Sequence, residues 1–243
     1  MSVTATKTVR ELAVDEPGAA RVFEGLGIDY CCGGKQTLEQ ACQAAGLQVG
    51  EVLNTLEAAK NSENGASSQT NWQTAPLADV IAHIKKTHHQ YTRQEVARLS
   101  PLFQKVCSVH GKNHPELLGL QDTFEGLAQE LTTHLMKEEM VLFPYIERME
   151  ESVLQGDPIL PPPFRTVQNP VGMMEREHDS AGNALRSLRS ASKGYAPPPD
   201  ACVSFQTLYK ALAELEADLH QHIHIENNIL FPRAIALEKE NRD

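Results

Sequence analysis

Two histidine and glutamate pairs have the residue types and the spacing of metal ligands. Glu138 follows His134 by four residues, and Glu226 follows His222 by four residues. Four residues along an α-helix turn about 400°, so the two side chains of each pair lie on one helix face. Imidazole nitrogen and carboxylate oxygen suit iron or manganese, and zinc as an alternative. A single pair of this kind is more often a surface pair or a buried hydrogen-bonded pair.

The two pairs belong to a longer internal repeat, which favours metal binding over an ordinary surface or hydrogen-bonded pair. Both run into Leu-Phe-Pro, at residues 142–144 and 230–232. Apolar residues precede each histidine at offsets of −10, −7 and −3, the spacing of one helix face. They are Phe124, Leu127 and Leu131 in the first half and Leu212, Leu215 and Leu219 in the second. A charged glutamate on such a face costs several kcal/mol unless it is paired or binds metal, so the duplication favours a shared metal site.

Two further histidines occupy matching positions upstream. Apolar residues follow His89 and His178 at +7 and +10, and the intervals to the next inward histidine are 45 and 44 residues. A duplicated helix pair predicts a four-helix bundle with ligands in its core. Four imidazoles would give each of two ions two nitrogen ligands, and two carboxylates can bridge the ions. The predicted metal ligands are His89, His134, Glu138, His178, His222 and Glu226.

Three neighbouring histidines are expected to lie outside this site. His220 and His224 are each two residues from His222, about 200° around the helix, and are expected to face solvent. His88 lacks the apolar residues that follow His89 at +7 and +10.

The other histidines are expected away from the bundle core. His110 and His114 have no counterpart in the second half and are expected in a loop. His110 is the candidate for an extra metal ligand. His83 is expected at the surface or beside the ligands.

Cys31 and Cys32 precede Gly33-Gly34, a pattern typical of a tight, exposed turn. Neighbouring Cα atoms are about 3.8 Å apart, closer than disulfides prefer, so a bond between these thiols would be strained and easily reduced. Reversible redox chemistry or transient metal binding is one interpretation. Burial as two small apolar residues is the other. The remaining cysteines are expected to pack within helices; they are Cys42, Cys107 and Cys202.

The composition favours an all-α protein of 243 residues with a formal charge of −10. This charge repels phosphate backbones and anionic lipid, and argues against nucleic-acid and membrane partners. No apolar run approaches the roughly 18 residues of a membrane span, and the N-terminus lacks the apolar core of a secretory signal. We therefore expect a cytoplasmic protein whose cysteines are mostly free thiols.

Polar and proline-rich segments divide the chain. Residues 61–75 are rich in Asn, Ser, Gln and Thr and are the predicted linker. Residues 1–60 are predicted to form a small helical domain with the vicinal cysteines, and residues 76–243 the four-helix bundle. A proline-rich segment at 158–170 separates the two halves of the bundle.

These motifs together resemble the bacterial iron-sulfur cluster repair di-iron proteins, also called repair-of-iron-centres proteins, in the hemerythrin-like superfamily. The resemblance covers nearly the whole chain. It rests on Tyr30-Cys31-Cys32-Gly33-Gly34, on both His-x-x-x-Glu pairs with their Leu-Phe-Pro, and on Glu177-His178-Asp179 with Gly182.

The resemblance implies two iron ions in an oxo- and carboxylate-bridged di-iron centre. The four predicted histidines would be terminal ligands, and Glu138 and Glu226 would bridge. It also implies a cytoplasmic homodimer that repairs clusters damaged by nitrosative or oxidative stress, as an iron donor more than as a classical enzyme. Its partners would be damaged iron-sulfur proteins, with nitric oxide or dioxygen as ligand and Cys31 and Cys32 as functional thiols. The alternatives are an enzyme that reduces nitric oxide or peroxide, and a hemerythrin-like gas carrier or sensor.

Overall fold

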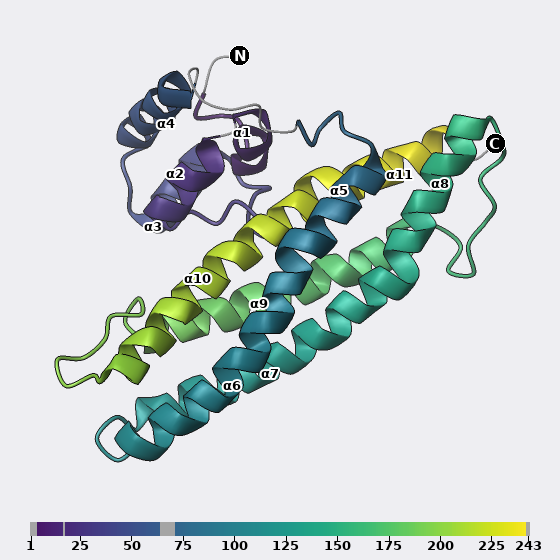
Figure 1. The fold of residues 1–243 in the computed structure, drawn as a ribbon. Helices are drawn as coiled ribbons and strands as arrows, with labels where there is room; N and C mark the ends of the chain where they lie inside the picture. The colour runs from purple at the N-terminus through teal and green to yellow at the C-terminus, as the bar shows by residue number, and fades with distance from the viewer. Residues whose placement is uncertain (1–3, 17, 64–70, 242–243) are drawn as a thin grey trace. The chain divides into compact units, whose positions relative to one another are not determined.

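The elements of the fold are helices in the part of the chain that the computed structural model describes, residues 4–16, 18–63 and 71–241 (Figure 1). The all-α class is therefore confirmed. An isolated bridge between Thr8 and Thr37 is the β-type pairing in these ranges. Contacts divide the chain into two compact units. One combines Met1–Pro76 with His220–Arg233, and the other combines Leu77–Leu219 with Ala234–Asp243.

The N-terminal part of the first unit is built from short helices: α1 (Val9–Asp15), α2 (Ala19–Leu26), α3 (Leu38–Ala45) and α4 (Val49–Glu63). Thr8 and Thr37 begin α1 and α3 with capping boxes, in which the threonine side chain accepts from a backbone amide three residues later. Both α2 and α3 end at a glycine with positive φ. Their apolar faces enclose one core, which includes Phe23, Tyr30 and Leu38.

The bundle consists of long helical rods, three of which contain a π-helical turn. The first rod is α5 (Leu77–Ile84), η1 (Lys85–His89) and α6 (Gln90–His110); the second is α7 (Glu116–Lys137), η2 (Glu138–Leu142) and α8 (Phe143–Gln155). The third rod is α9 (Gln168–Ala191), and the fourth is α10 (Val203–Ile225), η3 (Glu226–Leu230) and α11 (Phe231–Glu240). The short connection between α6 and α7 makes the first two rods antiparallel (Figure 1).

The apolar frame read from the sequence forms the core of the bundle. All six residues at offsets −10, −7 and −3 from His134 and His222 are buried in one cluster. Leu99, ten residues after His89, and Leu185 and Leu188, after His178, belong to the same cluster. The inward faces of the rods were thus encoded by helical periodicity alone.

Prolines explain the position of two of the π-helical turns. Pro144 and Pro232 are the second residues of α8 and α11, the helices that follow η2 and η3. Proline has no backbone N–H, and its ring clashes with the carbonyl four residues earlier. The preceding turn is wider: the amides of Phe143 and Phe231 bond to the carbonyls of Glu138 and Glu226, five residues back.

The expected linker, residues 61–75, is partly described. Helix α4 extends to Glu63, and residues 64–70 lie outside the described ranges. After that gap, Arg233 donates to the carbonyls of Trp72 and Ala75, at 2.7 and 2.6 Å. The end of the expected linker is therefore anchored within the first unit.

Candidate metal centre

Three of the predicted ligands lie at the edges of the π-helical turns. His89 is the last residue of η1, while Glu138 and Glu226 are the first residues of η2 and η3. Such turns often occur at functional sites, because the extra residue changes where neighbouring side chains point. Here α7 and α10 remain regular up to the glutamates, so the four-residue spacing from His134 and His222 places each pair on one face as predicted.

The predicted ligands of the second unit form a buried chain of contacts. Glu138 is fully buried, with Oε1 3.3 Å from His134 Nε2 and Oε2 3.4 Å from His89 Nε2. The Nε2 atoms of His134 and His178 lie 3.0 Å apart. His89 also stacks on Phe143, with ring centroids 5.6 Å apart. Three rods thus contribute donor atoms to one position.

Two carboxylates outside the predicted set orient these histidines. Nδ1 of His89 lies 2.7 Å from Glu139 Oε1, and Nδ1 of His134 lies 2.9 Å from Glu177 Oε2. A carboxylate only accepts, so Nδ1–H donates in each case. In a neutral imidazole, Nε2 then presents its lone pair towards Glu138. Carboxylates behind metal-binding histidines commonly fix this tautomer.

Both orienting carboxylates stay charged. Partial burial would raise the pKa of Glu139, but hydrogen bonds from Arg93 and His89 hold this pKa below its ordinary value. Partial burial would also raise the pKa of Glu177, but hydrogen bonds from Lys137 and His134 lower it below its ordinary value. At neutral pH each carboxylate therefore stabilises the N–H that faces it.

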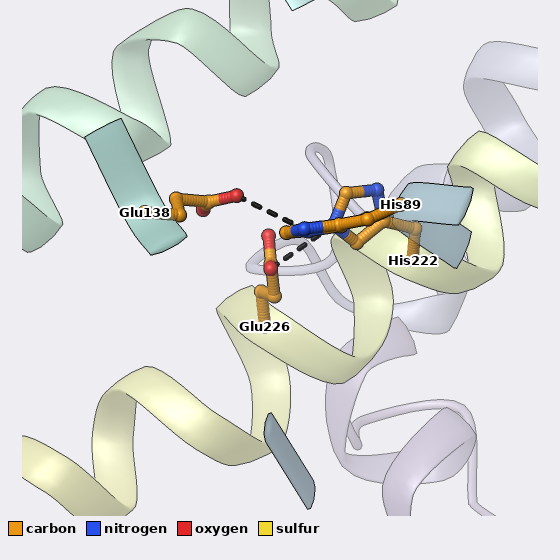
Figure 2. Close-up of side chains that lie close together, drawn as sticks. All are labelled: His89, Glu138, His222 and Glu226. Atoms are coloured by element: carbon orange, nitrogen blue, oxygen red, sulfur yellow. Dashed lines mark ion pairs between the residues drawn. The ribbon is translucent and has the colours of Figure 1, made fainter. Parts of the chain in front are cut away.

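The remaining predicted pair lies at the end of α10. His222 and Glu226 are buried, and His222 Nε2 lies 3.0 Å from Glu226 Oε1. Figure 2 shows this ion pair and the ion pair between His89 and Glu138.

Two sets of four side chains have the spacing of metal sites, and both sets contain the two glutamates. In each set the ligand atoms all lie within 4.8 Å of one another. The sets are His89, Glu138, His222 and Glu226, and His134, Glu138, His178 and Glu226. All six residues predicted from the sequence thus occur in these two sets.

The donor chemistry and spacing fit first-row metal ions. Two ligand atoms bound at right angles about 2.1 Å from an ion lie about 3.0 Å apart. The nitrogen and oxygen separations of 3.0–3.4 Å around Glu138 and Glu226 are close to that value. Imidazole and carboxylate without thiolate suit iron or manganese, with zinc as an alternative.

The expectation that His220 and His224 face solvent was wrong for His224. His224 is buried, packs edge-to-face against Tyr30 with ring centroids 5.4 Å apart, and contacts Asn228 Nδ2 through Nδ1 at 2.8 Å. Burial lowers its pKa to about 4. The partly exposed His220 binds Glu24, with Nδ1 2.9 Å from Oε2. The helix face opposite His222 is thus covered within the first unit.

The other histidines do not belong to these two sets. His88 is buried, and its Nδ1 lies 3.0 Å from Asp218 Oδ1. His83 is half-buried beside Thr87. His110, the candidate extra ligand, ends α6, and its Nε2 lies 3.1 Å from Cys202 Sγ. The expectation that Cys202 packs within a helix was therefore wrong, since this cysteine is exposed.

The vicinal cysteines form a smaller cluster with Asp29. The cluster could also hold a metal ion, because its ligand atoms lie within 4.8 Å of one another. Asp29 Oδ1 accepts from the amides of Cys31 and Cys32, at 3.2 and 2.9 Å, and from the Cys31 thiol at 3.4 Å. The two sulfur atoms are 3.7 Å apart and are free thiols.

The expectation of an exposed turn was wrong for Cys31, which is buried, while Cys32 is half-buried. The hydrogen bond to Cys32 and burial raise the pKa of Cys31, so its thiol is neutral at physiological pH. The two glycines keep the turn tight. A Cβ on Gly34 would lie 2.8 Å from the Tyr30 carbonyl oxygen.

Some residues of the site escaped the sequence reasoning. Glu139 has no acidic counterpart in the second half, where Asn227 occupies its place, so the repeat did not mark it. Glu177 precedes His178 and was part of the quoted motif, but no spacing rule connects it to His134. The signal for Asp29 was its place before a tight turn, where aspartate often caps backbone amides.

Comparison with known proteins identifies the family. The family described as Hemerythrin HHE cation binding domain matches residues 80–234, and a Domain of Unknown function matches residues 5–60. The iron-sulfur cluster repair protein YtfE of Cronobacter sakazakii is 38% identical over 229 residues, which cover 94% of this chain and 96% of that protein. This chain belongs to the iron-sulfur cluster repair protein family.

A second relative agrees. The probable iron-sulfur cluster repair protein of Haemophilus influenzae is 36% identical over 231 residues, which cover 95% of this chain and 97% of that protein. The family resemblance drawn from the motifs is therefore confirmed, as is the hemerythrin-like character of the bundle. In the described part of the chain, every helix is too short or too polar to cross a membrane.

Proposed function

We propose that this protein repairs damaged iron-sulfur clusters by holding two iron ions on its six buried ligands and releasing iron to the damaged cluster. The observation that carries the proposal is that both four-residue sets contain Glu138 and Glu226. A carboxylate has two oxygen atoms, so each glutamate can bind both ions and bridge them. His89 and His222 would complete one ion, and His134 and His178 the other.

Iron in this centre would supply exchangeable metal and electron-transfer chemistry. The protein's own residues hold and orient it. Glu139 and Glu177 fix the tautomers of His89 and His134. The apolar bundle core extends to Leu131 and Leu219, one turn before His134 and His222. Two glutamates for two ions leave positions for an oxo bridge and for a small ligand such as nitric oxide or dioxygen. We therefore extend the proposal to a bridged di-iron centre.

Cys31 and Cys32, with Asp29, are proposed as the site that receives iron before it reaches the damaged protein. Soft thiolates bind iron as it is bound in clusters. Because Cys31 is protonated without metal, iron binding there would release a proton and depend on pH.

The thiol turn is fixed on the segment that carries Glu226. Asn228 donates to the Tyr30 carbonyl at 3.0 Å, and Asn227 donates to the Cys31 carbonyl at 3.4 Å. Both asparagines belong to η3, which Glu226 begins. The thiols are therefore held on the helical segment that begins with a proposed iron ligand. This connection supports a role for the thiols in iron transfer. We place the reaction in the cytoplasm, where damaged iron-sulfur proteins are the proposed partners.

The test is a repair assay with isotopically labelled iron. Iron-loaded protein is mixed with a dehydratase whose cluster nitric oxide has damaged, and both dehydratase activity and the location of the label are measured. The expected result is recovered activity with labelled iron in the dehydratase. Recovery without label transfer would refute iron donation. Catalytic consumption of nitric oxide or peroxide without iron loss would instead support the enzyme alternative.

A further inference from the structure

A second cluster of reactive side chains lies in the bundle and is separate from the metal ligands. His110 ends α6, and Cys202 directly precedes α10, at the same end of the bundle (Figure 1). His110 Nε2 lies 3.1 Å from Cys202 Sγ, although 92 residues separate them in sequence. Cys202 is exposed, so small solutes can reach its sulfur.

The backbone around Cys202 favours a thiolate. The amides of Phe205 and Ser204, in the first turn of the 23-residue helix α10, donate to its sulfur. Free amides at a helix N-terminus stabilise negative charge. The hydrogen bond from the Phe205 amide lowers the pKa of the Cys202 thiol below its ordinary value, and the hydrogen bond with His110 adds to this effect.

The imidazole is held in position beside the sulfur. The ring of Phe205 packs against His110 and His114, with centroids 5.3 and 5.4 Å apart. The neighbouring carboxylates bind a different imidazole, because His114 lies 3.1 Å from both Asp200 and Glu116. His110 is the imidazole that contacts the Cys202 sulfur.

We propose that Cys202 and His110 form a thiolate and imidazolium pair that reacts with hydroperoxide, making Cys202 an oxidation site on this protein. The thiolate sulfur attacks one peroxide oxygen, so an S–O bond forms while the O–O bond breaks. Sulfur is oxidised by two electrons to a sulfenic acid, and the peroxide is reduced. With hydrogen peroxide, the departing oxygen takes the proton of His110 and leaves as water. This reaction does not depend on the metal centre.

Cys107 provides an internal reference thiol. It lies on α6 one turn before His110, donates to the Leu117 carbonyl at 3.5 Å, and is half-buried. Burial raises the pKa of Cys107, whereas the pKa of Cys202 is lowered. The thiol pKa values of the two cysteines therefore shift in opposite directions within one helical bundle.

The experiment measures labelling of each cysteine in the full-length, metal-loaded protein. Iodoacetamide reports the thiolate, and dimedone after a pulse of hydrogen peroxide reports the sulfenic acid. Trypsin yields Gly194–Lys210, a peptide whose single cysteine is Cys202, so mass spectrometry assigns the label directly. The variants are H110Q and, as the matched control, H83Q, which replaces a half-buried histidine beside Thr87.

The expected result is that Cys202 is labelled by both reagents several-fold faster than Cys107 at pH 7. H110Q should slow both reactions about two- to fivefold, the range that an exposed ion pair produces in water, and H83Q should not. Helical content by circular dichroism checks that each variant folds. If H110Q misfolds, the wild-type pH profile decides, since the alkylation rate of Cys202 should persist below the pH at which Cys107 loses reactivity. Equal rates for the two cysteines, or no effect of a folded H110Q, would overturn the proposal.

Discussion

The carboxylates behind the histidines give the sharpest test of the metal centre. In E177Q, the amide can still accept from His134 Nδ1, whose contact with the carboxylate is 2.9 Å, but the negative charge is lost. Loss of such a carboxylate typically weakens metal binding by about 10–100-fold. We expect a reduction of about tenfold in iron affinity, because Glu177 is partly exposed and its charge is partly screened.

The same substitution should change apo-protein stability little. Glu177 also pairs with Lys137, but both side chains of this ion pair are partly exposed, so the pair contributes about 0–1 kcal/mol. Its lowered pKa means that this contribution is present above the ordinary carboxyl pKa and is lost as pH falls through the lowered value. Near pH 7, therefore, the loss of iron affinity in E177Q should be measurable without a large change in the free energy of unfolding.

The assay is iron competition with a coloured chelator, combined with urea unfolding of the apo-protein. E130Q is the matched control, because Glu130 lies on α7, the helix that carries His134, and accepts from Ser180 of α9 at 3.0 Å, at an exposed position. It removes the same charge without touching a ligand. Equal iron affinities for E177Q and E130Q would refute the role assigned to Glu177.

Four further predictions concern the metal ligands and the thiol turn. Iron-loaded protein should contain about two irons per chain, and E138A should lose most of both; analysis giving one iron per chain, or a metal-replete variant, would contradict the shared bridge. Chelation should lower the melting temperature, since binding energy at a buried site is also folding energy, and an unchanged calorimetric transition would count against that site. The double variant of Cys31→Ala and Cys32→Ala should keep its iron but transfer little to a damaged cluster, whereas normal transfer would leave the thiols a packing role. G34A should destabilise the thiol turn by about 1–3 kcal/mol in urea unfolding, because its Cβ would meet the Tyr30 carbonyl.

Local geometry explains why the ligands could be found in the sequence. His134 and Glu138 are related by a helical spacing that holds wherever the helix lies, and the repeat supplied the same relation at His222 and Glu226. The apolar offsets then separated His89 from His88, and the structure places His89 in a ligand set while His88 contacts Asp218.

The same reasoning failed where a face is covered by another part of the chain. Periodicity placed His224 opposite His222, and this angular relation holds. It could not show that Tyr30 and Asn228 bury His224, because a surface that points away from one core can face another. The burial of Cys31 escaped prediction for the same reason, since Asn227 and Asn228 bind the backbone of its turn.

The sequence by itself determined the helical class, the inward faces of the bundle and the six residues proposed to bind metal. These features depend on short, regular spacings along a helix. Only the tertiary structure decided which carboxylates orient the histidines and that His110 contacts Cys202 instead of the metal ligands. The physical reason is that such contacts join residues tens of positions apart, whose approach depends on how whole helices pack and not on the local repeat of any one of them.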